Sequence, residues 1–397
     1  EELPTPNVYR TASGAPGHEY YQQKADYEIN VELDEEKNIL YGDEIITYTN
    51  YSPDVLNYLW VQLDQNVRAK NSHGQLTSTG SMKNNMSFRN IKRMHDRMDF
   101  DGGFKLEEVK DTYNNDLSYI INETMMRIEL PKSLRKGQSF SFKIKYSYNI
   151  NDRMKIGGRS GYEYFENEGN AIYTIAQFFP RMAVYNEVEG WQNKQFLGRG
   201  EFTLPFGDYK VSITVPSDHI VAATGELINA RSVLSETQIK RWEKAKNNFF
   251  DPVIIVTEEE AKENEKEKSK SQKTWTFEAK NVRDFGWASS RKFIWDAMAV
   301  DISGETVIPG PTFGDISSGK NLNGKIAGGN GAGGGEITKL INDEFISRFG
   351  PSNGRAFRCQ VGSERQSARA KSSKMTIHAN GHSGDCPPRK CRSCRQR

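Results

Sequence analysis

The sequence predicts a mainly β protein: one large layered domain of antiparallel or mixed strands, one or two short helices, and a glycine-rich basic tail. Apolar and polar residues alternate in many short segments, which is typical of strands with one buried face. Short polar turns join these segments, as in antiparallel sheets. The strand pattern ends where glycine, arginine and cysteine become frequent, after about residue 308.

The N-terminal part predicts an arm followed by a meander. Residues 1–19 hold three prolines and two glycines, which favours a loop-like arm. Alternation then predicts a strand over Tyr27–Leu33, with an acidic turn after it. Leu40–Tyr48 and Leu59–Leu63 continue the pattern, so we expect three consecutive strands paired as an antiparallel meander.

The next part predicts a long surface loop and then more strands. Lys70–Gly103 is polar and shows no periodicity, so we expect a surface excursion there. A turn is expected over Pro131–Gly137, and a charged loop over 149–161. Strands are expected in three segments: Phe104–Val109, Met125–Leu130 and Phe140–Tyr146.

The stretch from Ala171 to Leu227 has two contrasting halves. Its second half predicts a strand over Glu201–Leu204, a turn over 206–208, and a strand over Tyr209–Val215. Its first half contains Gln177–Met182, an apolar and aromatic run with one amide and one guanidinium. The amide of Gln177 is either a hydrogen-bonded core group or a specificity contact.

The last part of the domain predicts one clear helix. Ser235 and Gln238 form a capping-box pattern, apolar residues follow at helical spacing, and Pro252 ends the helix. The charged run Glu258–Lys273 is a solvated helix extension or a flexible loop. A strand is expected over Lys273–Glu278, and aromatic residues indicate core over Asn281–Val300.

Several of these segments together resemble the amino-terminal domain of the aminopeptidase N type zinc metallopeptidases, in their bacterial branch. The resemblance covers about residues 20–300. The segments that carry it are Tyr27–Leu33, Gly42–Asn50, Leu59–Gln65, Ala176–Arg181, Phe202–Pro216, Ala222–Gly225 and Asn281–Phe285.

The resemblance implies a fold and a role. In that family this domain is a β-rich saddle that roofs the catalytic domain, and a glutamine in it lines the pocket for the free amino terminus of the substrate. Gln177 is at the matching position. A neutral amide oxygen can accept hydrogen bonds from an ammonium group. The alternative, that Gln177 only hydrogen-bonds a neighbouring strand, stays open.

The zinc chemistry of that family needs His-Glu-x-x-His, which the sequence lacks. Only His378 and His382 have the right spacing, and Ala379 stands where the general base would be. We therefore expect no zinc bound to this chain and no activity from it alone. The chain is interpreted as a fragment that provides the substrate roof, with peptide substrates and the missing catalytic domain as its partners.

The C-terminal part differs in composition from the domain before it. We place a β domain over 20–308, a glycine-rich linker over 309–335, and a basic tail over 336–397 that is disordered or results from a frameshift or chimeric join. The tail carries thirteen Lys and Arg against five Asp and Glu, and all four cysteines.

Three patterns in this part are weak. Gly314–Asn321 nearly matches a phosphate loop, but Asn321 replaces the magnesium-binding hydroxyl. The tail cysteines, with His378 and His382, could bind zinc, yet no core surrounds them. The basic residues could bind nucleic acid, but no aromatic residue or groove-reading helix accompanies them.

Two alternatives to the aminopeptidase interpretation remain: a non-catalytic peptide-binding adaptor, and nucleic-acid binding through the tail. No run of about 18 apolar residues occurs, so we expect no membrane helix. A domain without cysteine suits an exported or a cytoplasmic protein. We favour an exported, periplasmic one.

Overall fold

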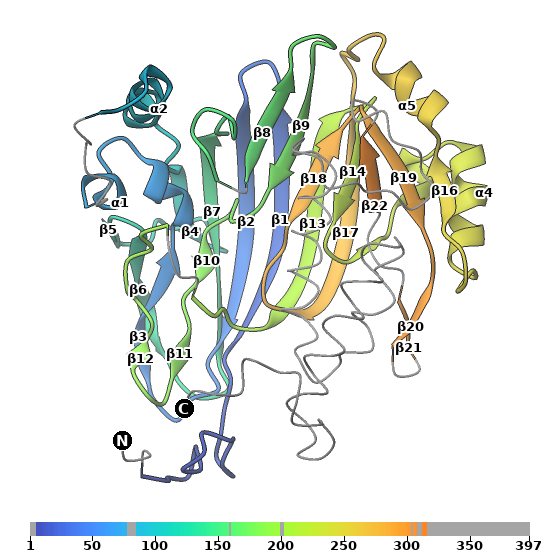
Figure 1. Ribbon diagram of the computed structural model, residues 1–397. Helices are drawn as coiled ribbons and strands as arrows, with labels where there is room; N and C mark the ends of the chain where they lie inside the picture. The colour runs from blue at the N-terminus through green and yellow to red at the C-terminus, as the bar shows by residue number, and fades with distance from the viewer. Residues whose placement is uncertain are drawn as a thin grey trace, which may run out of the picture.

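Seven strands form the main sheet of the protein (Figure 1). The computed structural model describes residues 5–77, 85–158, 160–198, 202–302, 305–307 and 312–315. The order of the sheet is β15-β17-β13-β1-β2-β7-β4. Its strands are β1 (Lys24–Asp34), β2 (Ile39–Thr49), β4 (Lys105–Asp111), β7 (Ser139–Asn149), β13 (Gly207–Pro216), β15 (Glu226–Leu227) and β17 (Gln272–Val282).

The main sheet is mixed rather than purely antiparallel. Strand β1 pairs with β2 in antiparallel fashion but with β13 in parallel, so that Ile29 lies opposite Val211. Strand β13 then pairs antiparallel with β17. Apolar residues alternate along β1 and β13, as the sequence predicted, and they bury the same face of the sheet.

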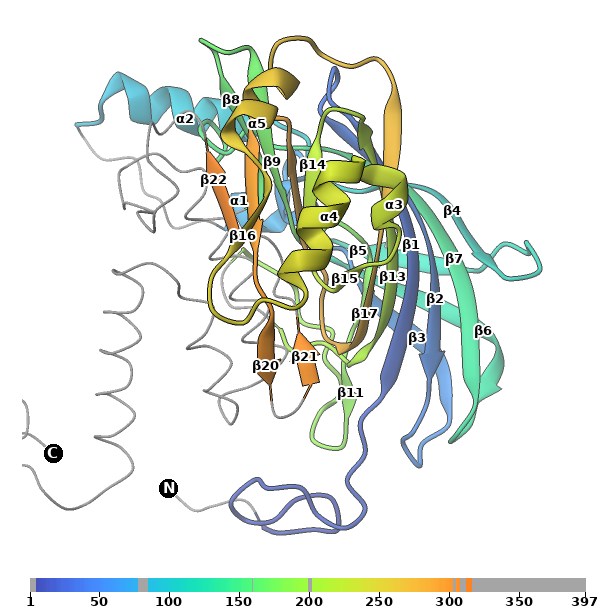
Figure 2. The same cartoon turned by 90° about the vertical axis from the view of Figure 1, so that its right-hand side faces the viewer.

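Smaller sheets face the main sheet and complete the layered fold (Figure 2). One sheet has the order β14-β18-β9-β8, another β10-β3-β6-β5, and a third β16-β19-β22. Two short hairpins pair β11 with β12 and β20 with β21. A single hydrophobic core joins the layers, because Ile29 and Val211 of the main sheet belong to the same cluster as Ile175 and Trp287.

The strands of these smaller sheets are short. Their bounds are β3 (Leu56–Gln62), β5 (Tyr119–Asn122), β6 (Met125–Leu134), β8 (Gly161–Phe165), β9 (Asn170–Ile175), β10 (Arg181–Met182), β11 (Tyr185–Asn186), β12 (Gly190–Trp191), β14 (Ile220–Ala223), β16 (Val253–Val256), β18 (Trp287–Ser290), β19 (Phe293–Ala297), β20 (Val300–Ile302), β21 (Glu305–Val307) and β22 (Thr312–Asp315). The predicted mainly β fold class is confirmed.

Helices are few and short in the part of the chain that the structure describes, although there are six rather than the one or two predicted. They are η1 (Asp64–Arg68), α1 (His73–Leu76), α2 (Phe88–Asp99), α3 (Ala230–Val233), α4 (Glu236–Ala245) and α5 (Glu258–Asn264). The capping box predicted at Ser235 and Gln238 is present at the start of α4. Trp242 of α4 packs on Trp295 of β19 with ring centroids 5.2 Å apart. No helix in the described part of the chain is long and apolar enough to cross a membrane.

Three predictions about the N-terminal half were wrong in detail. Strand β3 does not continue the meander, because it pairs with β6 and β10 in another sheet while β2 pairs with β7. The predicted surface loop Lys70–Gly103 contains α2, which the Ser87 side chain caps. The turn predicted from Pro131 begins later, since β6 continues to Leu134 past an irregularity in its pairing with β3.

Two predictions about the later part also need correction. Residues 202–204 form no strand, and Gly207 and Asp208 belong to β13 rather than to a turn. Within the predicted linker, Thr312–Asp315 form β22, which pairs with β19. The glycine-rich remainder of that linker, the near phosphate loop beyond Asp315, and the tail with its cysteines and His378 and His382 lie outside the described residues.

Candidate functional site

Gln177 lies in the short connection between β9 and β10 and has an unusual backbone. Its φ is +53°, in the left-handed region that residues other than glycine seldom adopt. Such a conformation costs on the order of 1 kcal/mol and persists only where the surroundings fix it. The two residues that follow, Phe178 and Phe179, are fully buried, and they anchor the connection in the core.

Two distant residues hold this left-handed connection by hydrogen bonds. The Nε2 of Gln65, on η1, donates to the carbonyl oxygen of Gln177 over 2.9 Å. The Ser160 hydroxyl accepts from the Ala176 amide over 3.1 Å and lies 3.2 Å from the Ala176 carbonyl oxygen. Arg68 donates in turn to the Gln65 side-chain oxygen over 3.0 Å. The backbone around Gln177 is therefore positioned by two separate segments, η1 and the loop that carries Ser160.

The side chain of Gln177 is half-buried and makes no hydrogen bond to any residue that the structure describes. The alternative considered from the sequence, a hydrogen bond to a neighbouring strand, is not seen among those residues. A half-buried amide leaves its oxygen able to accept and its nitrogen able to donate to a ligand. Its role stays a prediction.

The guanidinium of the same run, Arg181, is committed to buried ion pairs. Its Nη2 lies 2.8 Å from the Asp64 carboxylate, and its Nη1 contacts the Asp284 carboxylate. Burial disfavours the charge, but the two carboxylates outweigh burial and raise the pKa of Arg181. The pair with Asp64 links β10 to η1, the helix that also carries Gln65. Arg181 thus supports the connection rather than serving as a free contact.

A second polar cluster, which the sequence did not reveal, lies at the turn between β1 and β2. Arg291 binds both oxygens of Glu35, with its Nη2 2.9 Å from Oε1, and binds Asp218 through its Nε over 3.1 Å. His219 is fully buried, and its Nδ1 shares a hydrogen bond of 2.8 Å with Ser289. Burial lowers the pKa of His219, so its ring is neutral at pH 7.

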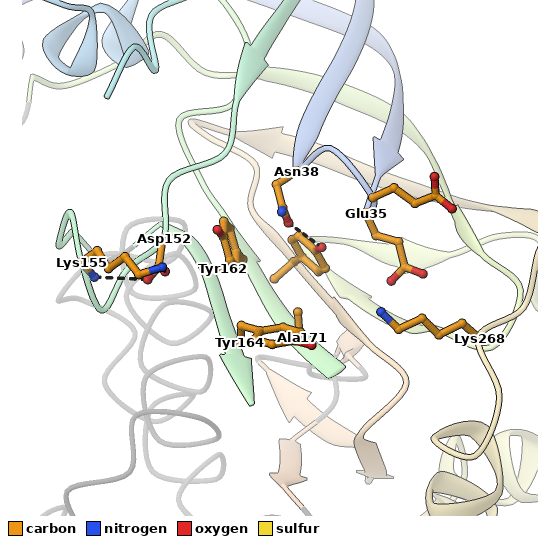
Figure 3. A pocket seen from close by; sticks show the side chains of 10 residues that line it. Glu35, Asn38, Asp152, Lys155, Tyr162, Tyr164, Ala171 and Lys268 are labelled. Atoms are coloured by element: carbon orange, nitrogen blue, oxygen red, sulfur yellow. Dashed lines mark hydrogen bonds and ion pairs between the residues drawn. The ribbon is translucent and has the colours of Figure 1, made fainter. Parts of the chain in front are cut away.

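Glu35 also faces a cavity of about 340 Å³ (Figure 3). The β1–β2 turn, the loop after β7, strands β8 and β9, and the segment between α5 and β17 that carries Lys268 line this cavity. Gln177 does not line it. The described part of the chain therefore holds two separate candidate sites, of which the sequence predicted only Gln177.

The described residues do not fit a zinc site. None of their groups of three or more His, Cys, Asp and Glu side chains could hold a metal ion. His219 is engaged with Ser289 inside the core, and His378 and His382 lie outside the described residues. No chemical step is therefore assigned to zinc in this part of the chain.

No protein-family model and no curated protein matches the sequence. Among solved structures, the chain is similar to an M1 zinc metallopeptidase from Deinococcus radiodurans. The identity is 12%, the match covers 73% of this chain and 47% of that chain, and the TM-score is 0.38. A second structure, a two domain M1 zinc metallopeptidase mutant bound to L-tryptophan, matches with 12% identity, 80% and 53% coverage, and a TM-score of 0.40. The M1 enzymes are the aminopeptidase N family.

A further structure of the Deinococcus radiodurans protein is a mutant bound to a Tyr-Ser-Ala substrate, with 12% identity and the same 73% and 47% coverage. Its TM-score is 0.38. The chain thus spans about half the length of the solved structures that it matches.

Proposed function

We propose that this chain provides the substrate roof of a zinc-dependent aminopeptidase, an enzyme that removes N-terminal residues from peptides. In this proposal the Gln177 side chain accepts a hydrogen bond from the free amino terminus of the peptide. The observation that carries the proposal is the half-buried Gln177 amide, which has no hydrogen bond to a described residue although its backbone is fixed on both sides. The sequence resemblance supplies the substrate class.

The chemistry of the contact favours an amide. A carboxylate would bind an ammonium group more strongly, but it carries its own desolvation cost and pKa, whereas an amide oxygen stays neutral at every working pH. The left-handed backbone and the Gln65 hydrogen bond fix the side-chain origin, which reduces the entropy lost on binding. A rigid support of this kind suits a contact that must select one end of a peptide.

Cleavage itself requires groups that this sequence does not contain. The zinc ligands and general base of the His-Glu-x-x-His type are absent from the 397 residues. In the proposal they come from a catalytic domain, which is the partner of this roof. The chain alone, incubated with zinc and an aminoacyl reporter, is expected to give only background turnover. Turnover that a chelator abolishes would contradict this expectation.

Binding of a short peptide tests the role of Gln177. We expect a tripeptide with a free amino terminus to bind the chain more tightly than its N-acetylated form in calorimetric titration. Gln177→Gly removes the side chain while keeping the left-handed backbone accessible, so binding of the free-amine peptide should weaken by about ten- to a hundredfold. Gln272→Ala, which removes an exposed amide on β17, is the matched control.

The second candidate, a non-catalytic peptide-binding module, rests on the same amide. It predicts the same loss of binding in Gln177→Gly. The two candidates separate when a catalytic domain of the family is added. Restored turnover in the mixture supports the roof, whereas binding without turnover supports the module.

A further inference from the structure

Three tyrosines form one wall of the cavity beside the β1–β2 turn. Tyr162 and Tyr164 are two residues apart on β8 and therefore share a face, and Tyr173 lies directly opposite Tyr162 on β9. Ala171 lies opposite Tyr164, and its small side chain leaves room above the strands. The rings of Tyr162 and Tyr173 are 6.0 Å apart. This wall is thus largely aromatic.

The other walls carry charge, with one negative charge in excess. Glu35, Glu36 and Asp152 contribute three carboxylates, and Lys155 and Lys268 contribute two ammonium groups. Behind the cavity, Arg291 pairs with both Glu35 and Asp218; Arg291 and Asp218 add one positive and one negative charge, so the excess stays at one.

Much of this charge is already committed. Arg291 holds both oxygens of Glu35. Lys155 lies 3.0 Å from the carboxylate of Asp152. Lys268, by contrast, points into the cavity between Glu35 and Tyr164 (Figure 3), and no described residue lies in ion-pair range of it. The cavity therefore already contains one cation, Lys268, that is unpaired among the described residues, and its walls still carry a net charge of one negative unit.

We propose that this cavity binds an organic cation of one positive charge, a guanidinium or alkylammonium group on an apolar stem, as in the side chain of a basic peptide residue. The negative faces of the two more exposed rings, Tyr162 and Tyr164, attract such a cation, and the excess carboxylate neutralises it. The proposal does not rest on Gln177, which lies outside the cavity.

Other ligand classes fit less well. An anion would meet an excess of carboxylates next to the electron-rich ring faces, and both repel it. Burial raises the pKa of Tyr162, and the negative charge of Asp152 raises it further, so a carboxylate acts on this ring. A neutral polar ligand would gain hydrogen bonds but would leave the net charge of the walls uncompensated.

A pair of isosteric probes tests the charge of the ligand. Acetyl-arginine amide and acetyl-citrulline amide have nearly the same shape, but only the first is a cation. In titrations of the full chain followed by NMR, we expect the arginine probe to bind at least fivefold more tightly, and the difference to shrink as salt is added. Equal affinity for the two probes would overturn the proposal in favour of a neutral ligand.

Variants of the lining residues test whether the probe binds in this cavity. Glu36→Gln and Tyr164→Ala should each weaken binding of the arginine probe about threefold, because both residues are exposed and line the cavity. Lys268→Ala removes the competing cation and should tighten binding about threefold. A tighter complex is an outcome that partial unfolding cannot produce. Glu166→Gln, in the turn after β8 and outside the cavity, is the control that should change nothing.

Two results would contradict this assignment. Unchanged affinity in Lys268→Ala would show that the probe binds elsewhere, and so would an equal loss in Glu166→Gln and Glu36→Gln. The test of Gln177 remains separate, because Gln177→Gly should leave binding of the arginine probe unaffected.

Discussion

At the scale of single residues, the run from Gln177 to Met182 divides its polar groups between two tasks. Arg181 is 5% exposed and is paired with two carboxylates, so it serves the fold. Gln177 is half-buried and has its main chain, but not its side chain, bound to described residues. Both polar positions are visible in the sequence. Their different roles depend on Asp64, Asp284 and Gln65, which are more than 100 residues away in the chain.

The buried pair at Arg181 should be costly to break. Arg181→Met leaves the buried Asp64 carboxylate without its cation, and we expect the free energy of unfolding to fall by about 3 to 5 kcal/mol. Urea denaturation followed by circular dichroism measures this loss. Lys194→Met, which breaks an exposed pair with Glu189, should change stability by less than about 1 kcal/mol. Similar losses in both variants would argue against the buried ion pair.

Glu44 should give the protein a pH-dependent stability. Its side chain is 1% exposed, and neither carboxylate oxygen has a hydrogen-bond partner among the described residues. Burial, and next the charge of Asp43, raise its pKa well above the ordinary 4.5. The folded chain therefore keeps a proton that the unfolded chain releases, so this contribution is complete below pH 4.5 and is lost as the pH rises through the folded pKa.

Glu44→Gln should remove that dependence. We expect the variant to gain stability relative to the parent as the pH rises from 4.5 to 8, in unfolding free energies measured across that range. Glu28→Gln, at an exposed position of the neighbouring strand β1, serves as the control. Parallel pH profiles for the parent and Glu44→Gln would rule out a protonated Glu44.

At the scale of elements, the position of Gly207 shows what alternation alone does not reveal. The sequence predicts a turn over Phe206–Asp208, because glycine and aspartate favour turns. In the structure Gly207 starts β13, and an added Cβ there would lie 1.5 Å from the carbonyl oxygen of Ala25. Glycine is required by the close approach of two chains, which is a contact between distant segments.

Replacing this glycine should damage the sheet. Gly207→Ala forces the start of β13 away from the segment around Ala25, and we expect a loss of about 3 kcal/mol in unfolding free energy. Gly137→Ala is a useful comparison, since that glycine has a positive φ of 79° but open space around it. Its cost should be about 1 kcal/mol. Equal costs at the two positions would contradict the close-approach explanation.

The elements that the sequence did predict share one property, which is that a local signal defines them. Alternation of apolar and polar residues predicted β1, β2, β7 and most of β13, and the capping box predicted α4. Helix α2 was missed although Phe88, Ile91 and Met98 recur at helical spacing, because polar and charged residues dominate the segment and obscure that period. The short strands β8 to β10 were missed because they depend on pairing rather than on alternation.

At the scale of the whole molecule, the topology brings the candidate site together. Parallel pairing of β1 with β13 joins residues nearly 200 apart, and the smaller sheets lie on the core face that this pairing creates. No sequence pattern specifies a parallel pair between distant strands. The cavity likewise needs three segments and could not be predicted. The position of Gln177 could be predicted, because the sequence resemblance indicates it. The hydrogen bonds from Gln65 and Ser160 that hold its backbone could not be predicted.

A double-mutant cycle tests whether Gln177 receives the amino terminus of a peptide. One arm replaces Gln177 by glycine, and the other replaces the free amine of a tripeptide by its acetylated form. Calorimetric affinities for the four combinations give the coupling energy between the two groups. We predict a coupling of about 1.5 to 3 kcal/mol, the range for a hydrogen bond to a charged group. A coupling near zero, with both single changes lowering affinity independently, would contradict it.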